Sequence, residues 1–115
     1  MINGGFDPSL RVLLLPGWLD SGPGHWQTHW EERFGFQRVQ QDDWTWPRRG
    51  DWMARLEDTL LADERPALLV AHSLGCHLVA AWAAHSRHLD RVKAALLVAT
   101  PDLGRADLPP QLASW

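Results

Sequence analysis

The stretch AHSLGCH, residues 71–77, places one serine in a pattern typical of an activated nucleophile. Ser73 stands between the apolar run LLVA and a segment of helical composition, LGCHLVAAWAAH. A serine nucleophile exposed on a sharp strand-to-helix turn needs small residues two positions before it and two after it, because the backbone folds tightly there. Ala71 and Gly75 meet this requirement, with alanine in place of the more usual glycine. The pattern predicts acyl-transfer chemistry.

A helix cap is the alternative role for this serine, since serine commonly occupies the N-cap position. The strand before Ser73 and the helix after it favour the nucleophile. Leu74 would then begin the helix and direct its N–H group at developing negative charge. The loop after the first strand, PGW, is expected to supply a second N–H donor. Gly17 permits close backbone approach and Trp18 is the predicted donor, the alternative being a glycine needed only for the turn.

A serine hydroxyl needs a neighbouring base to become a good nucleophile. After Ser73 the chain offers only His77, His85 and His88, all in or just after the helix that leads away from the turn. We predict none of them as the base. Asp102, just past the last apolar run, is the one carboxylate that the topology places to act as an alternative acid.

Histidines before the serine have other interpretations. His72 is expected to pack or to give hydrogen-bond support. His25, with its neighbour Trp26, lies near the loop that flanks the predicted site, and we interpret both as candidate lining of a substrate pocket. His25 and His29 have the spacing of zinc ligands, but HWQTH lacks the glutamate of H-E-x-x-H and has no clear third ligand. We therefore predict no metal and no cofactor.

Four apolar runs predict the strands that position these residues. RVLLLPG (11–17) ends at a proline and a glycine, as a buried strand does, and FQRVQQ (36–41) is a weaker candidate. ALLVAHS (67–73) and ALLVATP (95–101) share their first five residues. We interpret these two as central strands, because a continuous apolar run is typical of a strand whose two faces are both covered by helices.

Helical patterns alternate with these runs. Trp26, Trp30 and Phe34 recur at every fourth position, and the segment 42–50 is rich in turn formers and predicts a loop. Asp51 is expected to cap the next helix, which ends before a proline and carries an apolar face of Trp52, Leu56 and Leu60. Alternating strands and helices indicate a parallel sheet with right-handed crossovers, so the segments after residues 15, 71 and 99 should share one edge.

Composition limits the class of protein. The 115 residues, 45% of them hydrophobic, predict one domain over 1–115, and a net charge of −3 without a basic stripe argues against a nucleic-acid partner. No apolar run approaches the roughly 20 residues that span a bilayer, and the start, MINGGFDPSL, lacks a signal-peptide pattern. A single cysteine, Cys76, fits a reducing compartment. We expect a soluble, cytoplasmic protein, whose eight tryptophans mostly fill the core while some line a pocket.

Five blocks of the sequence carry a family resemblance: LLLPGWLDSGPGHWQTHWE, DDWTWP, DWMARLEDTLLA, LLVAHSLGCHLVAAWA and ALLVATPD. From about Arg11 to Asp102 the chain resembles the bacterial branch of the retinoblastoma-binding protein nine-like serine hydrolases. The resemblance implies a lidless α/β-hydrolase core, a three-layer, mostly parallel sheet with helices on both faces. It further implies Ser73 as nucleophile and activity on small esters or related acyl substrates.

The same resemblance implies a later acid, in an S-x-x-D-P-like block, and a still later histidine, in a G-H-like block. Neither block is present, which also argues against Asp102 as the acid. We therefore expect a C-terminally truncated chain, with the last two strand–helix units and the acid and base beyond residue 115, and a fragment that is inactive alone. The alternative is a non-catalytic binding module with exposed tryptophans as contact anchors.

Overall fold

The structure, a computed structural model, describes residues 7–115, so most of the segment examined for a signal peptide lies outside the described residues. Its four strands form one parallel sheet in the order β2-β1-β3-β4. The strands are β1 (Arg11–Leu15), β2 (Gln37–Arg38), β3 (Ala67–His72) and β4 (Val92–Val98). The helices are α1 (Trp26–Phe34), α2 (Arg49–Leu61) and α3 (Leu74–His85), with short 3₁₀ turns η1 (Leu89–Arg91) and η2 (Pro110–Leu112).

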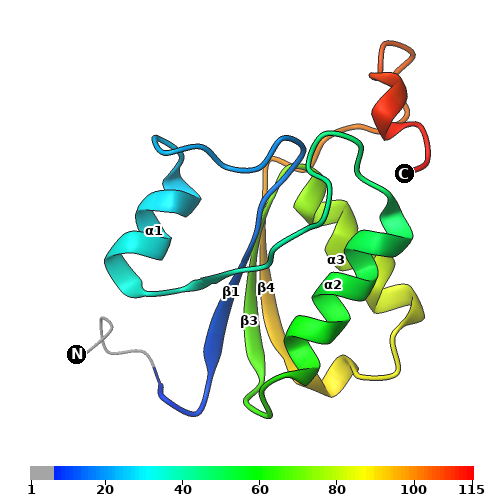
Figure 1. Ribbon diagram of the computed structural model, residues 1–115. Helices are drawn as coiled ribbons and strands as arrows, with labels where there is room; N and C mark the ends of the chain where they lie inside the picture. The colour runs from blue at the N-terminus through cyan, green and yellow to red at the C-terminus, as the bar shows by residue number, and fades with distance from the viewer. Residues whose placement is uncertain (1–6) are drawn as a thin grey trace.

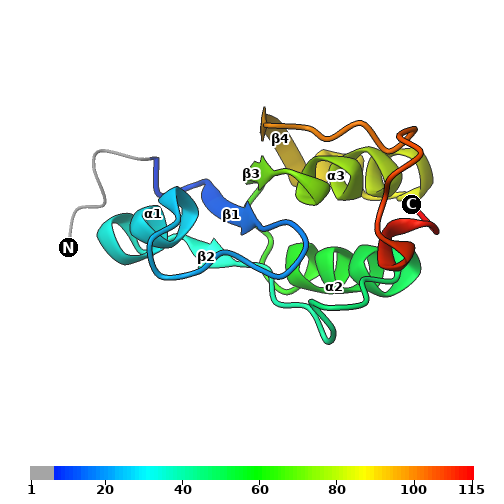
Figure 2. The ribbon, with the colours of Figure 1, turned by 90° about the horizontal axis from the view of Figure 1, so that it is seen from above.

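Helices cover both faces of the sheet, which confirms the predicted three-layer α/β fold (Figures 1 and 2). Successive side chains of β1 point to opposite faces and enter different apolar clusters. Leu13 and Leu15 pack with residues of α2 and α3, whereas Val12 and Leu14 pack on the side of α1. This alternation explains why β1 is apolar at every position after Arg11: each of its faces has a helix to meet.

The helices match the predicted segments except at the start of α2. The N-cap residue of α2 is Arg48, and Asp51 lies within the first turn of the helix. The prediction that Asp51 caps this helix is therefore wrong. A carboxylate in the first turn still faces the positive end of the helix dipole, which is a favourable position for it. Within the described chain, no helix is long and apolar enough to cross a bilayer.

The last strand differs from its prediction. β3 is central and largely buried, but most of β4 is exposed, and Leu96 and Leu97 are 49% and 50% exposed. β4 pairs with β3 along one side only, and the apolar cluster under α1 is built on β1, β3 and Phe36. The expectation that helices cover both faces of this strand is thus wrong for residues 7–115.

Candidate active site

The turn between β3 and α3 holds Ser73 in a strained conformation. Its backbone has φ 55° and ψ −122°, a region that a residue with a side chain adopts only when its surroundings enforce it, at a cost of about 1–3 kcal/mol. The Ser73 N–H donates to the carbonyl oxygen of Val98 at 2.9 Å, and the Ser73 carbonyl accepts from the N–H of Cys76 at 2.9 Å. The end of β4 and the first turn of α3 therefore both fix this serine.

The hydroxyl of Ser73 does not cap the helix. Although Ser73 occupies the N-cap position of α3, its side chain accepts no hydrogen bond from the first turn. The cap was the alternative interpretation of this residue, and the geometry does not support it. The strained backbone instead leaves the hydroxyl without a protein partner among residues 7–115.

Two glycines allow the loop after β1 to touch this turn. A Cβ on Gly75 would lie 2.3 Å from the carbonyl oxygen of Leu15, which no real side chain can tolerate. A Cβ on Gly17 would lie 3.0 Å from the Cβ of Ser73 and 3.2 Å from the amide nitrogen of Leu74. The close backbone approach predicted at Gly17 is thus confirmed.

Two backbone amides at this junction are unused. Among residues 7–115, neither Trp18 nor Leu74 donates its N–H to a protein acceptor. Their neighbours in the loop are occupied, because the N–H of Leu19 donates to Trp44 at 3.0 Å and that of Asp20 to Gly17 at 3.1 Å. Free amides near a serine at the N-terminal end of a helix are suited to stabilise an oxyanion.

An imidazole pair stands beside the turn. The ring centroids of His25 and His72 are 4.5 Å apart, and the Trp26 ring lies 5.9 Å from that of His72. The fold therefore brings both predicted pocket residues, His25 and Trp26, to the residue that precedes Ser73. Burial lowers the pKa of both imidazoles below the ordinary 6.5, and the neighbouring His72 lowers the pKa of His25 further. The Nδ1 atom of His25 accepts from the N–H of Gln27 at 3.1 Å, so the neutral ring carries its proton on Nε2.

Two of the three histidines after Ser73 are engaged elsewhere. The Nε2–H group of His77 donates to the carbonyl oxygen of Pro101 at 2.8 Å, and the Nδ1–H group of His85 donates to Ala81 of its own helix at 2.8 Å. Asp102 is exposed, and its Oδ1 accepts from the N–H of Gly104 at 2.8 Å. Within the described chain, none of these groups hydrogen bonds to Ser73.

Two polar side chains near the turn escaped the sequence analysis. Gln27 is fully buried and bonds to the carbonyl ends of β1 and β3. Arg38 pairs with Asp20 at 2.9 Å and Glu31 at 3.0 Å and so ties the loop after β1 to α1. No local pattern in the sequence marks either side chain, because the partners of both lie on other elements of the fold.

No group of three or more histidine, cysteine, aspartate or glutamate side chains in residues 7–115 is arranged to hold a metal ion. Trp46, at 50%, is the one exposed tryptophan. The others lie in or against the apolar clusters, as predicted: Trp18, Trp26, Trp30, Trp44, Trp52, Trp82 and Trp115.

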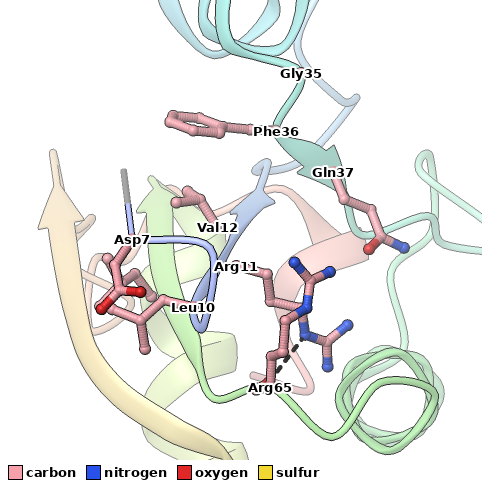
Figure 3. A pocket seen from close by; sticks show the side chains of 9 residues that line it. Asp7, Leu10, Arg11, Val12, Gly35, Phe36, Gln37 and Arg65 are labelled. Atoms are coloured by element: carbon pink, nitrogen blue, oxygen red, sulfur yellow. Dashed lines mark hydrogen bonds between the residues drawn. The ribbon is translucent and has the colours of Figure 1, made fainter. Parts of the chain in front are cut away.

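A separate pocket of about 200 Å³ lies at the opposite edge of the sheet (Figure 3). Residues from the starts of β1 and β2 line it, together with Asp7, Leu10 and Arg65. Arg11 in its wall donates to the carbonyl oxygens of Leu60 and Asp63 and so caps the C-terminal end of α2. None of the predicted site residues reaches this pocket.

Comparison with known proteins identifies a family for this chain. A family model described as "Serine hydrolase" matches residues 12–114, while none of the curated proteins compared matches the chain. A solved structure described as a YdeN-like hydrolase, from Pectobacterium atrosepticum, is 29% identical and superimposes with a TM-score of 0.77 over 85% of this chain. The match covers 52% of that protein, so the chain spans about half its length. This chain belongs to the serine hydrolase family.

Proposed function

We propose that this chain carries the nucleophile and the oxyanion site of a serine hydrolase. The observation that carries the proposal is the strained backbone of Ser73 at a strand-to-helix turn, which leaves its hydroxyl free. In the proposed reaction, Ser73 Oγ attacks the acyl carbon of the substrate and the alcohol leaves. The N–H groups of Trp18 and Leu74 stabilise the negative charge on the carbonyl oxygen. Water then hydrolyses the acyl-enzyme and frees Ser73.

We propose further that the acid and the base lie outside residues 1–115. The base takes the proton of Ser73 and passes it to the leaving alcohol, then takes a proton from the attacking water and returns it to Ser73, while the acid orients the base. Support comes from His77 and His85, whose rings are bonded elsewhere, and from the length of the YdeN-like hydrolase, of which this chain matches 52%. The open side of β4 offers a place where such a segment can pair.

Small esters with an apolar acyl group are the proposed substrates. Leu19, 57% exposed, follows the predicted oxyanion donor Trp18 and hydrogen bonds to the loop that carries Trp46. These two side chains leave apolar surface exposed on and beside the loop of the predicted donor, which supports an apolar acyl group. The resemblance of the sequence to the retinoblastoma-binding protein nine-like hydrolases points to the same substrate class, and we propose that branch for this protein.

A fluorophosphonate probe, which modifies activated serines covalently, tests the proposal on the full-length protein. We expect labelling of the wild type, its loss in Ser73→Ala, and a fall in ester hydrolysis on the order of 10⁴-fold or more. Ser9→Ala is the matched control, because Ser9 is exposed and bonded to Asp7, and it should label as the wild type does. A folded wild type that stays unlabelled would overturn the hydrolase proposal.

A further inference from the structure

Gln27 joins the ends of two strands. Its Nε2 group donates to the carbonyl oxygens of Leu15 at 3.1 Å and Val70 at 3.0 Å, and its Oε1 accepts from the hydroxyl of Ser21 at 2.7 Å. The side chain is 0% exposed. Both N–H groups of the amide and its oxygen thus have partners, although no water reaches them.

The two carbonyl groups belong to the two segments that form the proposed oxyanion site. Leu15 ends β1 and leads directly into the loop 16–18, and Val70 lies three residues before Ser73. The oxygen of Leu15 also faces Gly75 in the elbow, at a distance that leaves no room for a Cβ. One carbonyl group is therefore held between the amide of Gln27 and the turn that carries the serine.

The surroundings of Gln27 determine which way its amide faces. The hydroxyl of Ser21 donates to Oε1, which leaves Nε2 as the atom that faces the two carbonyls. Arg38 in turn holds the backbone of Ser21, since its guanidinium donates to the Ser21 carbonyl oxygen at 2.9 Å. At the other end, the backbone N–H of Gln27 is bonded to the imidazole of His25. The amide cannot rotate without breaking several buried bonds.

We propose that Gln27 is a positioning residue for the hydrolase reaction: it sets the distance between the Trp18 and Leu74 amides by clamping β1 to β3. The inference rests on the proposed function. Oxyanion donors act only when they lie within hydrogen-bond distance of the oxygen in the transition state. Gln27 does not touch the substrate, so its loss should weaken stabilisation of the transition state more than binding of the ester.

Gln27→Met is the decisive variant, because methionine has a similar length and no donor. In the full-length protein with p-nitrophenyl acetate as substrate, we expect kcat to fall about 10-fold or more. KM should stay within about threefold, because ground-state binding does not use the oxyanion donors. An unchanged kcat in folded Gln27→Met would overturn the inference.

Leu60→Ala controls for loss of stability alone. Leu60 is equally buried but lies at the C-terminal end of α2, by the opposite edge of the sheet. This variant should lower Tm and leave kcat of the folded protein within twofold of the wild type. Where Gln27→Met does not fold, Ser21→Ala decides, because it removes the bond that orients the amide. A several-fold fall in its kcat supports the inference, and an unchanged kcat overturns it.

Hydrogen exchange separates failure of this inference from failure of the proposed function. If the wild type hydrolyses no ester and Ser73 is not labelled, the proposed function fails. The clamp itself is then judged by exchange at the hydrogen-bonded amides beside the site, those of Leu19, Asp20, Ser73 and Cys76, in Gln27→Met or Ser21→Ala. Faster exchange there, with no change in α2, supports the clamp. Unchanged exchange overturns it.

Discussion

The run ALLVA occurs twice, within β3 and across the end of β4, and the two copies meet different surroundings. In β3 the run begins the strand at Ala67, and Leu69 is 1% exposed. In β4 it begins at Ala95, in the middle of the strand, and Leu97 is 50% exposed. Leu69 pairs with Ala95, so the two runs are offset by two residues. An even offset keeps corresponding side chains on the same face of the sheet.

The difference shows what an apolar run does and does not specify. It specifies a strand suited to burial on both faces, and it does not say which segment provides the cover. β3 receives its cover from neighbouring strands and from helices within residues 7–115. β4 has a partner strand on one side only. Its C-terminal end nevertheless helps to fix the site, because the Val98 carbonyl accepts a hydrogen bond from the N–H of Ser73. The apolar composition of β4 supports the proposal that further chain packs against this strand.

Matched truncations in the two runs test the comparison most directly. In the 115-residue chain, Leu69→Ala should lower the free energy of unfolding by about 2–5 kcal/mol, because it leaves a cavity in a closed core. Leu97→Ala should cost less than about 1 kcal/mol, since half of that side chain is already exposed. Urea unfolding of both variants measures the difference.

Equal costs for the two truncations would break the comparison. They would show that β4 is covered in solution, for example by a second copy of the chain. The same pair in the full-length protein sharpens the proposal that further chain covers β4. There Leu97→Ala should cost as much as Leu69→Ala, and a cost that stays small would count against such a cover.

Much of the fold was predictable because its signals are local. The segments of α1 and α3 and the central strands follow from apolar spacing and from breakers such as Pro16 and Pro66, and the elbow follows from the small residues around Ser73. Gln27 was not predictable, because its partners in β1 and β3 lie 12 and 43 residues away in the sequence. Nothing local distinguishes a buried glutamine that clamps two strands from an exposed one on a helix.

The segments that follow β3 and β4 give a second, smaller contrast. Gly75→Ala should destabilise the chain by about 1–3 kcal/mol, because the new Cβ meets a backbone carbonyl that cannot move freely. Gly104→Ala, in the loop after β4, should stay within about 0.5 kcal/mol of the wild type, because the nearest atom, at 3.2 Å, belongs to the exposed side chain of Asp102, which can shift. Thermal unfolding of both variants measures the two costs. A large cost at Gly104 would show that the loop after β4 is packed as tightly as the turn after β3.

The smallest expected effect is a pH dependence of stability that belongs to the end of β3. The pKa of His72 and that of His25 are lowered in the folded chain, so between the folded values and 6.5 the unfolded chain binds more protons. Stability is therefore fully present above pH 6.5 and is lost as pH falls through the folded pKa values. A difference of one bound proton between the folded and unfolded chains changes the free energy of unfolding by about 1.4 kcal/mol per pH unit. The partial exposure of both rings makes the expected change smaller.

Urea unfolding at pH 7.5, 6.5 and 5.5 measures this slope apart from the carboxylates. Asp63 and Asp107, hydrogen bonded to Arg65 and Arg105, have pKa values lowered below 3.8, so their contribution changes only in more acidic solution. His72→Gln should flatten the profile, because it removes one lowered imidazole and the charge that lowers the pKa of His25. If the slope of stability against pH is unchanged in His72→Gln, the pH dependence comes from groups outside β3. The ends of β3 and β4 then do not differ in this respect.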